Sequence, residues 1–510
     1  MTTEDAAAAT TGASVARGGA WTLASRIIPQ VNTLAISIAA ARFLGPDDFG
    51  RQSFIAFVSI SVTVLASAGF SSALSRFTGE RLGADDPGAV RDLVRWGLAV
   101  QLTFGAGAGA ALAAAGLLGA DPGAAWVLAA VSTAVGVIHS VPSSLLVGMQ
   151  LWRQASIVGM VTGTVAVPAT IGVLAAGGGI AGMFAVDAAI AAANLLWTAA
   201  LARRALEGLA SRAAAAGDVR RRAARFAGIS TITVLLYLVV FMRSEFVFLE
   251  TFSTDAEIGL YSISFAAMSA LMKVPDTVAI VIAPAFATLL GAGQWDRIRS
   301  GYSRMARLLP VVTFPLTALG IVLGPELVNL VYGDEYSGVG PVLVVMLATL
   351  PVVAYAGVCE ATLLALERQR PIVLGLTVGT LVNIVLNLVL VPPYDAVGAA
   401  AANGVAQITA TVPMYLAAGR LAGPIVWDAR SLTVITAASA AMGGVAYGAV
   451  LGLGGVGVVP GALAGSAAFI AVGALLGGLS RADAEWIDKA AGARLGGLVG
   501  RTARLLAAQS

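Results

Sequence analysis

Long apolar segments alternate with short polar turns along almost the whole chain of 510 residues. A membrane-spanning helix needs about 20 mostly apolar residues. Fourteen segments reach that length, at residues 18–43, 52–75, 94–118, 124–148, 155–176, 180–202, 226–249, 258–289, 303–324, 339–365, 371–391, 396–419, 431–453 and 456–478. The pattern predicts an all-α, polytopic membrane protein with about 14 transmembrane helices.

The positions of the arginines support this count. If the N-terminus is cytoplasmic, nearly all arginines between the segments fall in inner loops, at 76–95, 153, 203–225, 297–307, 368–370 and 420–430. The outer turns carry acidic residues such as Asp47 and Asp48, and only Arg51 clearly departs from the pattern. The positive-inside rule predicts this alternation for fourteen spans with both termini cytoplasmic. We expect a multi-pass protein of a bacterial cytoplasmic membrane.

Composition excludes several other classes. Hydrophobic residues make up 58% of the chain and charged residues 12%, with a mean hydropathy of +0.87, whereas a soluble domain is about 25% charged. The single cysteine, Cys359, allows no intrachain disulfide, and with the single histidine, His139, it is too little for a Cys/His metal site. We expect no cofactor and no nucleic-acid partner.

A weak internal repeat divides the chain. The stretch RFLGPDDFGRQSF (42–54), shifted by 209 residues, lies on TFSTDAEIGLYSI (251–263), and both copies cross an acidic outer turn between two apolar segments. Because both halves start inside, the repeat is parallel. The predicted parts are a disordered cytoplasmic tail (1–17), two six-helix lobes (18–202 and 226–420), a basic linker (203–225), an extra helix pair (431–478) and an amphipathic cytoplasmic tail (479–510).

The linker carries a cluster of arginines. Such a cluster contacts anionic lipid headgroups or phosphates, or it forms an amphipathic surface helix that only sets topology. The sequence leaves both interpretations open.

Four segments resemble the polysaccharide-type flippases of the multidrug/oligosaccharidyl-lipid/polysaccharide (MOP) exporter superfamily, in the order found there. They are ARFLGPDDFG, RSEFVFLETFSTDAEIGLYSISF, LVNLVYGDEYS and NIVLNLVLVPPYDAVGAAAAN. The resemblance covers about residues 18–420. It implies two six-helix lobes around a central cavity, and alternating access that moves a lipid-linked sugar to the outer leaflet. It also places the superfamily's Arg-x-acid pattern on Arg243 and Glu245, and its Asn-rich span on Asn383 and Asn387.

Ionisable and polar residues inside the spans are candidates for transport, because hydrocarbon disfavours them. In the first span, Arg26 and Gln30 belong to a polar stripe with Thr22, Thr33 and Ser37. The stripe forms a cavity wall in which Arg26 holds a pyrophosphate, or it packs against other helices while Arg26 extends to the inner surface.

The second half offers further candidates. On one helix Arg243 and Glu245 point about 200° apart and do not pair directly. Arg243 binds phosphate or extends to the outer surface, and Glu245 is a counter-charge or a protonatable coupling group. Lys273 and Asp276, at i and i+3, form a local ion pair beside a proline bend.

Two other acidic residues within spans, Asp187 and Glu360, are candidates for ion coupling. Asn383 and Asn387 bind sugar hydroxyls or form interhelical hydrogen bonds.

Three functions remain after these observations. The first is a flippase for polyprenyl-diphosphate-linked oligosaccharide or polysaccharide precursors, with proton or Na⁺ as a possible coupling ion and a polysaccharide polymerase or glycosyltransferase as a possible partner. The second is a cation-coupled multidrug exporter of the same superfamily. The third is a membrane-embedded enzyme or scaffold of polysaccharide assembly. Short outer loops without paired catalytic groups argue against an enzyme.

Overall fold

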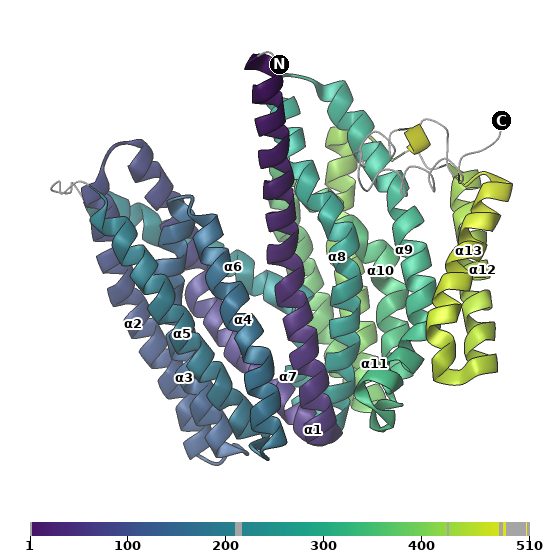
Figure 1. Ribbon diagram of the computed structural model, residues 1–510, viewed down its shortest axis with the longest axis horizontal. Coiled ribbons are helices and arrows are strands. Elements are labelled where there is room, and N and C mark those ends of the chain that lie inside the picture. Colours follow the sequence, from purple (N-terminus) through teal and green to yellow (C-terminus); the bar gives the residue numbers. More distant parts are fainter. Residues whose placement is uncertain (1–2, 210–216, 426–427, 479–482, 486–505, 507–510) are drawn as a thin grey trace. The chain divides into compact units, whose positions relative to one another are not determined.

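The computed structural model describes residues 3–209, 217–425, 428–478, 483–485 and 506. The side chains of residues 3–26, 217–218, 277–281 and 283–284 lie outside this description. Within the described ranges the chain is helical and contains no strand, which confirms the predicted all-α class (Figure 1).

Thirteen α-helices follow one another in the described part of the chain. They are α1 (Thr3–Gly83), α2 (Pro87–Leu117), α3 (Gly123–Gly148), α4 (Trp152–Ala175), α5 (Gly179–Glu207), α6 (Gly217–Phe241), α7 (Glu245–Phe252), α8 (Asp255–Gly291), α9 (Trp295–Tyr332), α10 (Val339–Ala365), α11 (Arg370–Ala422), α12 (Ala429–Leu453) and α13 (Val458–Leu476). Short 3₁₀ turns, η1 (Asp334–Tyr336) and η2 (Gly454–Gly457), lie before α10 and α13.

The predicted number of spans agrees with the helices. Eleven segments of the described chain are long and apolar enough to cross a membrane. Three of them are 57, 53 and 48 residues long, about twice the length that one crossing needs. Each of these three contains a break or a turn and supplies two crossings, so the segments are consistent with about fourteen spans.

The breaks inside the long helices fall where the sequence has turn signals. In α1 the backbone leaves the helical region at Gly45 (φ 78°, ψ 174°), directly before Pro46. Glycine adopts this left-handed φ without the steric cost that a side chain brings. In α11 the break is at Asp395 (φ 47°, ψ −132°). The helix α1 begins at Thr3, so it includes most of the tail predicted to be disordered, where runs of alanine favour a helix.

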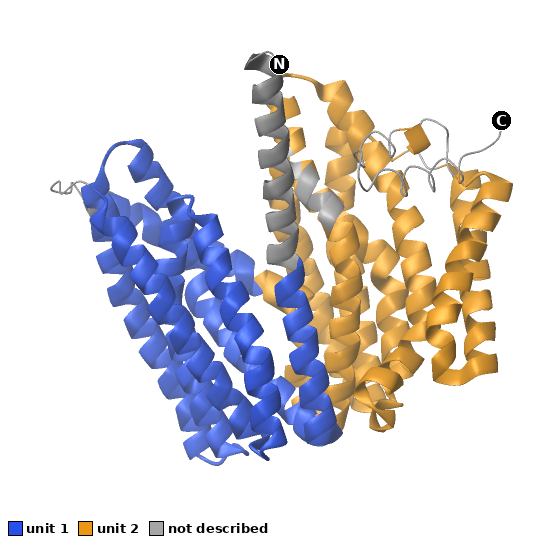
Figure 2. Ribbon diagram, viewed as in Figure 1, with its two compact units in different colours: residues 1–235 blue, residues 236–510 orange. Residues whose placement is uncertain are grey.

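Two compact units make up the chain, residues 1–235 and 236–510 (Figure 2). The division falls inside α6. The predicted C-terminal tail, residues 479–510, lies outside the described residues except for 483–485 and 506.

Unit 1 packs helices α1 to α5 and the start of α6. One of its cores contains Leu74 of α1, Leu93 of α2 and Leu145 of α3, all almost completely buried. Small residues allow close helix contacts: a Cβ at Gly105 on α2 would stand only 2.9 Å from the carbonyl oxygen of Ala134 on α3. Close backbone approach of this kind is a common basis for helix association in membranes.

Unit 2 contains the rest of α6 and the helices α7 to α13. Its main core lies between α9, α10 and α11, and a smaller one lies between α9, α12 and α13. The two halves of α11 run back along each other, since a Cβ at Gly379 would lie 2.7 Å from the Cβ of Ala410. This arrangement places polar residues of both halves of α11 beside α7.

Candidate functional site

The predicted span at residues 226–249 is interrupted in the structure. α6 ends at Phe241 and α7 begins at Glu245, with the non-helical residues 242–244 between them. The expectation of one continuous helix through Arg243 and Glu245 was therefore wrong. Non-helical backbone at membrane depth is tolerated only where protein or cavity water satisfies its polar groups, and interrupted helices frequently mark transport sites.

Side chains satisfy the carbonyl groups that the end of α6 leaves without helical partners. Ser244 Oγ donates to the carbonyl oxygen of Val239 at 2.7 Å. The amides of Asn403 and Gln407, on α11, donate to the carbonyl oxygen of Val240 at 3.4 and 3.3 Å. The break is thus held by residues that lie about 160 positions further along the chain.

Glu245 is the centre of a buried hydrogen-bonded group, which we call the Glu245 cluster. Its side chain has no exposed surface. Asn383 Nδ2 and Asn403 Nδ2 each donate to Oε1 at 2.7 Å, and Tyr261 Oη donates to Oε2 at 2.9 Å. A buried charge without partners is very costly, whereas these three donors and the N-terminus of α7 all favour a carboxylate.

The amides on α11 extend the cluster. Asn387 Nδ2 donates to the backbone oxygen of Asn383 at 2.8 Å and to its Oδ1 at 3.1 Å. Among the described residues, Asn387 Oδ1 has no hydrogen-bond partner although it is buried. Gln407 Nε2 donates to Asn403 Oδ1 at 2.7 Å. Both predicted asparagines are completely buried and form bonds within this cluster.

Arg243 lies in the break, on the side of α8. Its guanidinium donates to Ser262 Oγ at 3.2 Å. The guanidinium carbon lies 5.8 Å from the ring centre of Phe246 and 5.0 Å from that of Phe265. Contacts with aromatic faces stabilise a cation at a site poor in water, so Arg243 is held by α7 and α8 together.

A polar cavity of about 550 Å³ lies next to the cluster in unit 2. It brings together Lys273 and Asp276 of α8 and Glu360 of α10, three residues that the sequence had singled out separately. Tyr237 and Phe241, whose ring centres lie 4.9 Å apart, form an aromatic wall. The other lining residues are Met242, Phe265, Met268, Ser269, Met272, Val353, Ala356, Gly357, Ala361, Leu364 and Gln407.

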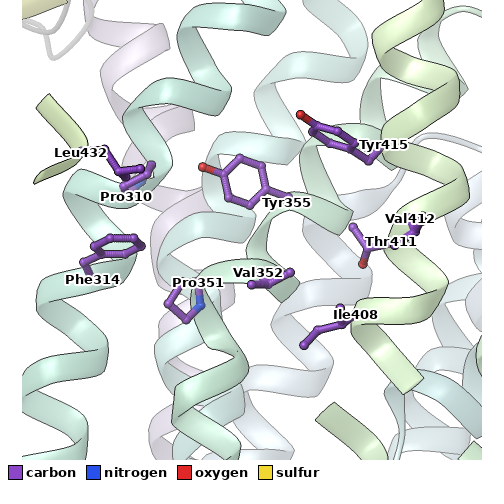
Figure 3. Close-up of a pocket in the computed structure, with 10 residues that line it drawn as sticks. All are labelled: Pro310, Phe314, Pro351, Val352, Tyr355, Ile408, Thr411, Val412, Tyr415 and Leu432. Carbon is purple, nitrogen blue, oxygen red and sulfur yellow. The ribbon is translucent and has the colours of Figure 1, made fainter. Parts of the chain in front are cut away.

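A second, apolar pocket of about 540 Å³ lies in the same unit between α9, α10, α11 and α12 (Figure 3). Its lining consists of Pro310, Phe314, Pro351, Val352, Tyr355, Ile408, Thr411, Val412, Tyr415 and Leu432. Tyr355 Oη donates to the carbonyl oxygen of Ala306 at 2.9 Å, so its polar end already has a partner. The pocket therefore offers hydrocarbon surface and little else.

The remaining candidates, Arg26, Gln30 and Asp187, belong to unit 1. Gln30 is partly buried on α1, and the side chain of Arg26 lies outside the described residues. Thr33 Oγ1 donates to the carbonyl oxygen of Pro29 at 2.9 Å, which satisfies it within α1. Asp187 is exposed on α5.

The basic linker forms ion pairs that the sequence did not indicate. Arg220, near the start of α6, pairs with Asp92 of α2. Arg222 pairs with Glu80 of α1 at 3.0 Å. These pairs attach the described end of the linker to unit 1.

Sequence reasoning missed Tyr261, Asn403 and Gln407. Asn403 and Gln407 are four residues apart in an alanine-rich span, which is the same i, i+4 spacing as in Asn383 and Asn387. That repeated spacing was the available signal. The described residues contain no group of three or more His, Cys, Asp or Glu side chains suited to a metal ion.

Two family models match the chain. The model described as "Polysaccharide biosynthesis protein" matches residues 39–341, more than half of the chain. The model described as "Lipid II flippase MurJ" matches residues 269–472. No curated protein matches.

Several solved structures share the fold. A structure described as lipid II flippase MurJ in an inward closed conformation is 12% identical, covers 90% of this chain and 98% of its own, and has a TM-score of 0.70. An inward-facing multidrug resistance MATE transporter is 12% identical, with 77% and 94% covered and a TM-score of 0.67. A MOP superfamily transporter from Pyrococcus furiosus is 12% identical, with 78% and 93% covered and a TM-score of 0.53.

Proposed function

The chain belongs to the family of polysaccharide biosynthesis proteins, and we propose that it is a flippase within this family. Its proposed substrate is a lipid-linked, polyprenyl-diphosphate oligosaccharide or polysaccharide precursor, moved from the inner to the outer leaflet by alternating access. The match of residues 269–472 to the lipid II flippase model supports a lipid substrate. The proposed setting is a bacterial cytoplasmic membrane, with both termini cytoplasmic.

The observation that carries the proposal is the pair of pockets on α10. Val353, Ala356 and Glu360 face the polar cavity, whereas Pro351 and Tyr355 face the apolar pocket. At about 100° per residue, these two sets lie on roughly opposite faces of the helix. A molecule with a polar head and a long hydrocarbon chain needs both environments close together, and unit 2 supplies them on one helix.

The polar cavity offers groups that suit a sugar diphosphate. Lys273 supplies a positive charge for phosphate, and Arg243 stands against Phe265 of the cavity wall. Asp276 and Glu360 accept hydrogen bonds from hydroxyl groups. Arg26 and Gln30, on α1, remain proposed contacts of the head group, as do Asn383 and Asn387.

We place ion coupling at the Glu245 cluster. Glu245 is the one candidate acid that is completely buried among neutral donors. Asn387 donates to Asn383, and its Oδ1, an acceptor without a partner among the described residues, is a further oxygen of the cluster. Carboxylate and amide oxygens suit a proton or a hard cation such as Na⁺. Asp187, Asp276 and Glu360 are the alternative coupling residues.

The test is a leaflet-accessibility assay in proteoliposomes with labelled polyprenyl-diphosphate sugars. We expect faster exposure of the label than in empty vesicles, and at least about a tenfold loss of rate in Lys273→Ala, because one charge-assisted contact contributes about 1.5–3 kcal/mol. Glu335→Ala, which removes an exposed charge outside both pockets, serves as the control. No acceleration with several candidate lipids would refute the proposed function.

Coupling is tested in the same vesicles. A proton gradient and a Na⁺ gradient are imposed separately, and Glu245→Gln is compared with the original chain. We expect one gradient to accelerate transport and Glu245→Gln to remove that acceleration. If the variant responds as the original chain does, Glu245 is not the coupling group.

A cation-coupled multidrug exporter is the second candidate, and one observation favours it. The polar cavity holds two acidic side chains and one basic side chain, together with an aromatic wall, and aromatic faces and carboxylates bind organic cations well. Uptake of a labelled lipophilic cation that depends on Asp276 and Glu360, with no movement of the sugar lipid, would establish this alternative.

A further inference from the structure

The helices α2, α3 and α5 of unit 1 form a groove. It has a volume of about 440 Å³. Its apolar walls include Leu98 of α2, Pro142 of α3, and Leu195 and Ala199 of α5. Arg91, Arg95, Arg203 and Glu207 also line it, which gives the groove a formal charge of +2. We refer to it as the α2–α5 groove.

The charged residues gather at one end of this groove. Arg91 and Arg95 lie in the first turns of α2, and Arg203 and Glu207 lie in the last turns of α5. Arg91 donates to the carbonyl oxygens of Leu206, at 3.1 Å, and Leu209. It thereby satisfies carbonyl groups at the end of α5, where a positive charge is also favoured.

Arg95 and Arg203 remain accessible at the groove. Arg95 is one helical turn beyond Arg91 on the same side of α2, and it is exposed. Arg203 pairs with Glu207 at 2.8 Å, but their side chains are 83% and 61% exposed. An exposed pair of this kind contributes little to stability, so a phosphate can replace Glu207 as the partner of Arg203 at little cost.

The apolar part of the groove is long enough for most of an acyl chain's path through one leaflet. Along α5 the lining from Leu195 to Arg203 measures about 12 Å at about 1.5 Å per residue. Half of a hydrocarbon core of about 30 Å is about 15 Å. An acyl chain whose phosphate lies at Arg203 therefore follows the groove through most of its own leaflet.

We propose that the α2–α5 groove binds an anionic glycerophospholipid of the surrounding membrane, with the phosphate at Arg95 and Arg203 and one acyl chain along Leu98, Leu195 and Ala199. Basic pockets between membrane helices bind anionic headgroups by this chemistry. The bound lipid joins α2 to the end of α5, so it stabilises unit 1. This site does not depend on the proposed transport function.

The proposal is tested by thermal unfolding of the purified full-length chain in a non-ionic detergent, titrated with phosphatidylglycerol or phosphatidylcholine. A ligand that binds only the folded protein raises its unfolding temperature. We expect phosphatidylglycerol to raise it and phosphatidylcholine to leave it nearly unchanged. Equal shifts with both lipids would refute the proposal.

Two double variants with the same loss of charge separate the groove from a general charge effect. Arg95→Ala with Arg203→Ala should weaken phosphatidylglycerol binding roughly 30-fold, at about 1 kcal/mol for each arginine. Arg297→Ala with Arg299→Ala, on the exposed start of α9, should leave binding within about twofold. An equal loss in both variants would assign the effect to net charge and overturn the site.

Further variants guard against misfolding and identify the ligand. Glu207→Gln should strengthen phosphatidylglycerol binding, because it removes the competitor for Arg203, and a gain of affinity does not arise from misfolding. Ala199→Trp should block the path of the acyl chain and weaken lipid binding, although the arginines remain in place. A full shift with glycerol phosphate alone, or selective binding of polyprenyl phosphate, would overturn the assignment to a phospholipid.

Discussion

Removal of the Glu245 carboxylate tests whether the Glu245 cluster holds the break between α6 and α7. Glu245→Ala takes away the acceptor of three hydrogen bonds, those from Asn383, Asn403 and Tyr261. All three donors are buried, so water does not replace the lost acceptor without a rearrangement of the helices.

The size of the expected loss of stability follows from these three donors. A buried donor left without an acceptor costs about 1–3 kcal/mol, although interhelical hydrogen bonds in membranes average about 0.6 kcal/mol. About 1 kcal/mol for each donor gives a loss of about 3 kcal/mol. At about 2 °C per kcal/mol for a unit of this size, Glu245→Ala should lower the unfolding temperature by about 6 °C. Glu245→Gln, which keeps one acceptor oxygen, should lose about half as much.

Cys359 provides the assay, because it is the only cysteine and is completely buried in unit 2. Its reaction with a thiol-specific fluorophore on heating reports the opening of that unit. Glu335→Ala, at an exposed position of unit 2, is the matched control and should change the temperature by less than about 1 °C. A shift below about 2 °C in Glu245→Ala, or an equal shift in the control, would refute the role given to the cluster.

Three other changes have defined outcomes. Gly379→Ala should lower the stability of unit 2 by about 1–3 kcal/mol in the same assay, since the new Cβ would lie 2.7 Å from a Cβ of the opposite half of α11. Gly419→Ala, whose new Cβ would enter open space, should leave the stability unchanged or raise it. A hydrogen bond from the Ser431 hydroxyl holds the pKa of Asp428, the N-cap of α12, below its usual range. The cap therefore stabilises the protein at neutral pH, and this contribution is lost as the pH falls through the lowered pKa. The stability difference between the original chain and Asp428→Ala, measured by thermal unfolding, should therefore shrink as the pH falls below the usual titration range of an aspartate. Val412→Trp should fill the apolar pocket and slow transport of long-chain substrates more than of short-chain analogues, measured in the vesicle assay.

The spans could be predicted because a membrane allows few kinds of backbone structure to cross it. Apolar runs set their number, and the turn signals at Gly45, Pro46 and Asp395 mark where the long helices break. The matches with the polysaccharide biosynthesis and lipid II flippase family models, together with the shared fold, confirm the predicted resemblance. These features depend on local sequence, so local sequence reveals them.

The break at residues 242–244 could not be predicted in the same way. Met, Arg and Ser are all acceptable within a helix. Besides the local bond from Ser244 to Val239, the break is stabilised by Asn403 and Gln407, which donate to the carbonyl oxygen of Val240 from the second half of α11. Because these two partners lie about 160 residues away, the local sequence pattern does not indicate the break.

The candidate residues were found one at a time for a related reason. An ionisable group in an apolar span is conspicuous on its own, so Lys273, Asp276 and Glu360 could each be singled out. The fold alone places them in one cavity. Neutral partners such as Tyr261 are not conspicuous, because tyrosine is common in membrane proteins.

Gln407 connects the two polar features of unit 2. It lines the cavity, and it also donates to Asn403 and to the carbonyl oxygen of Val240. A ligand or ion shifts a conformational equilibrium only through contacts that differ between the two states. In the proposed mechanism, a cation at Glu245 competes with the amide of Asn403 for the carboxylate oxygens, and Asn403 in turn orients Gln407. Substrate contact with Gln407 and ion binding at Glu245 then act on the same break between α6 and α7. The side chains of Glu245, Asn403 and Gln407 are therefore sufficient to couple the two events.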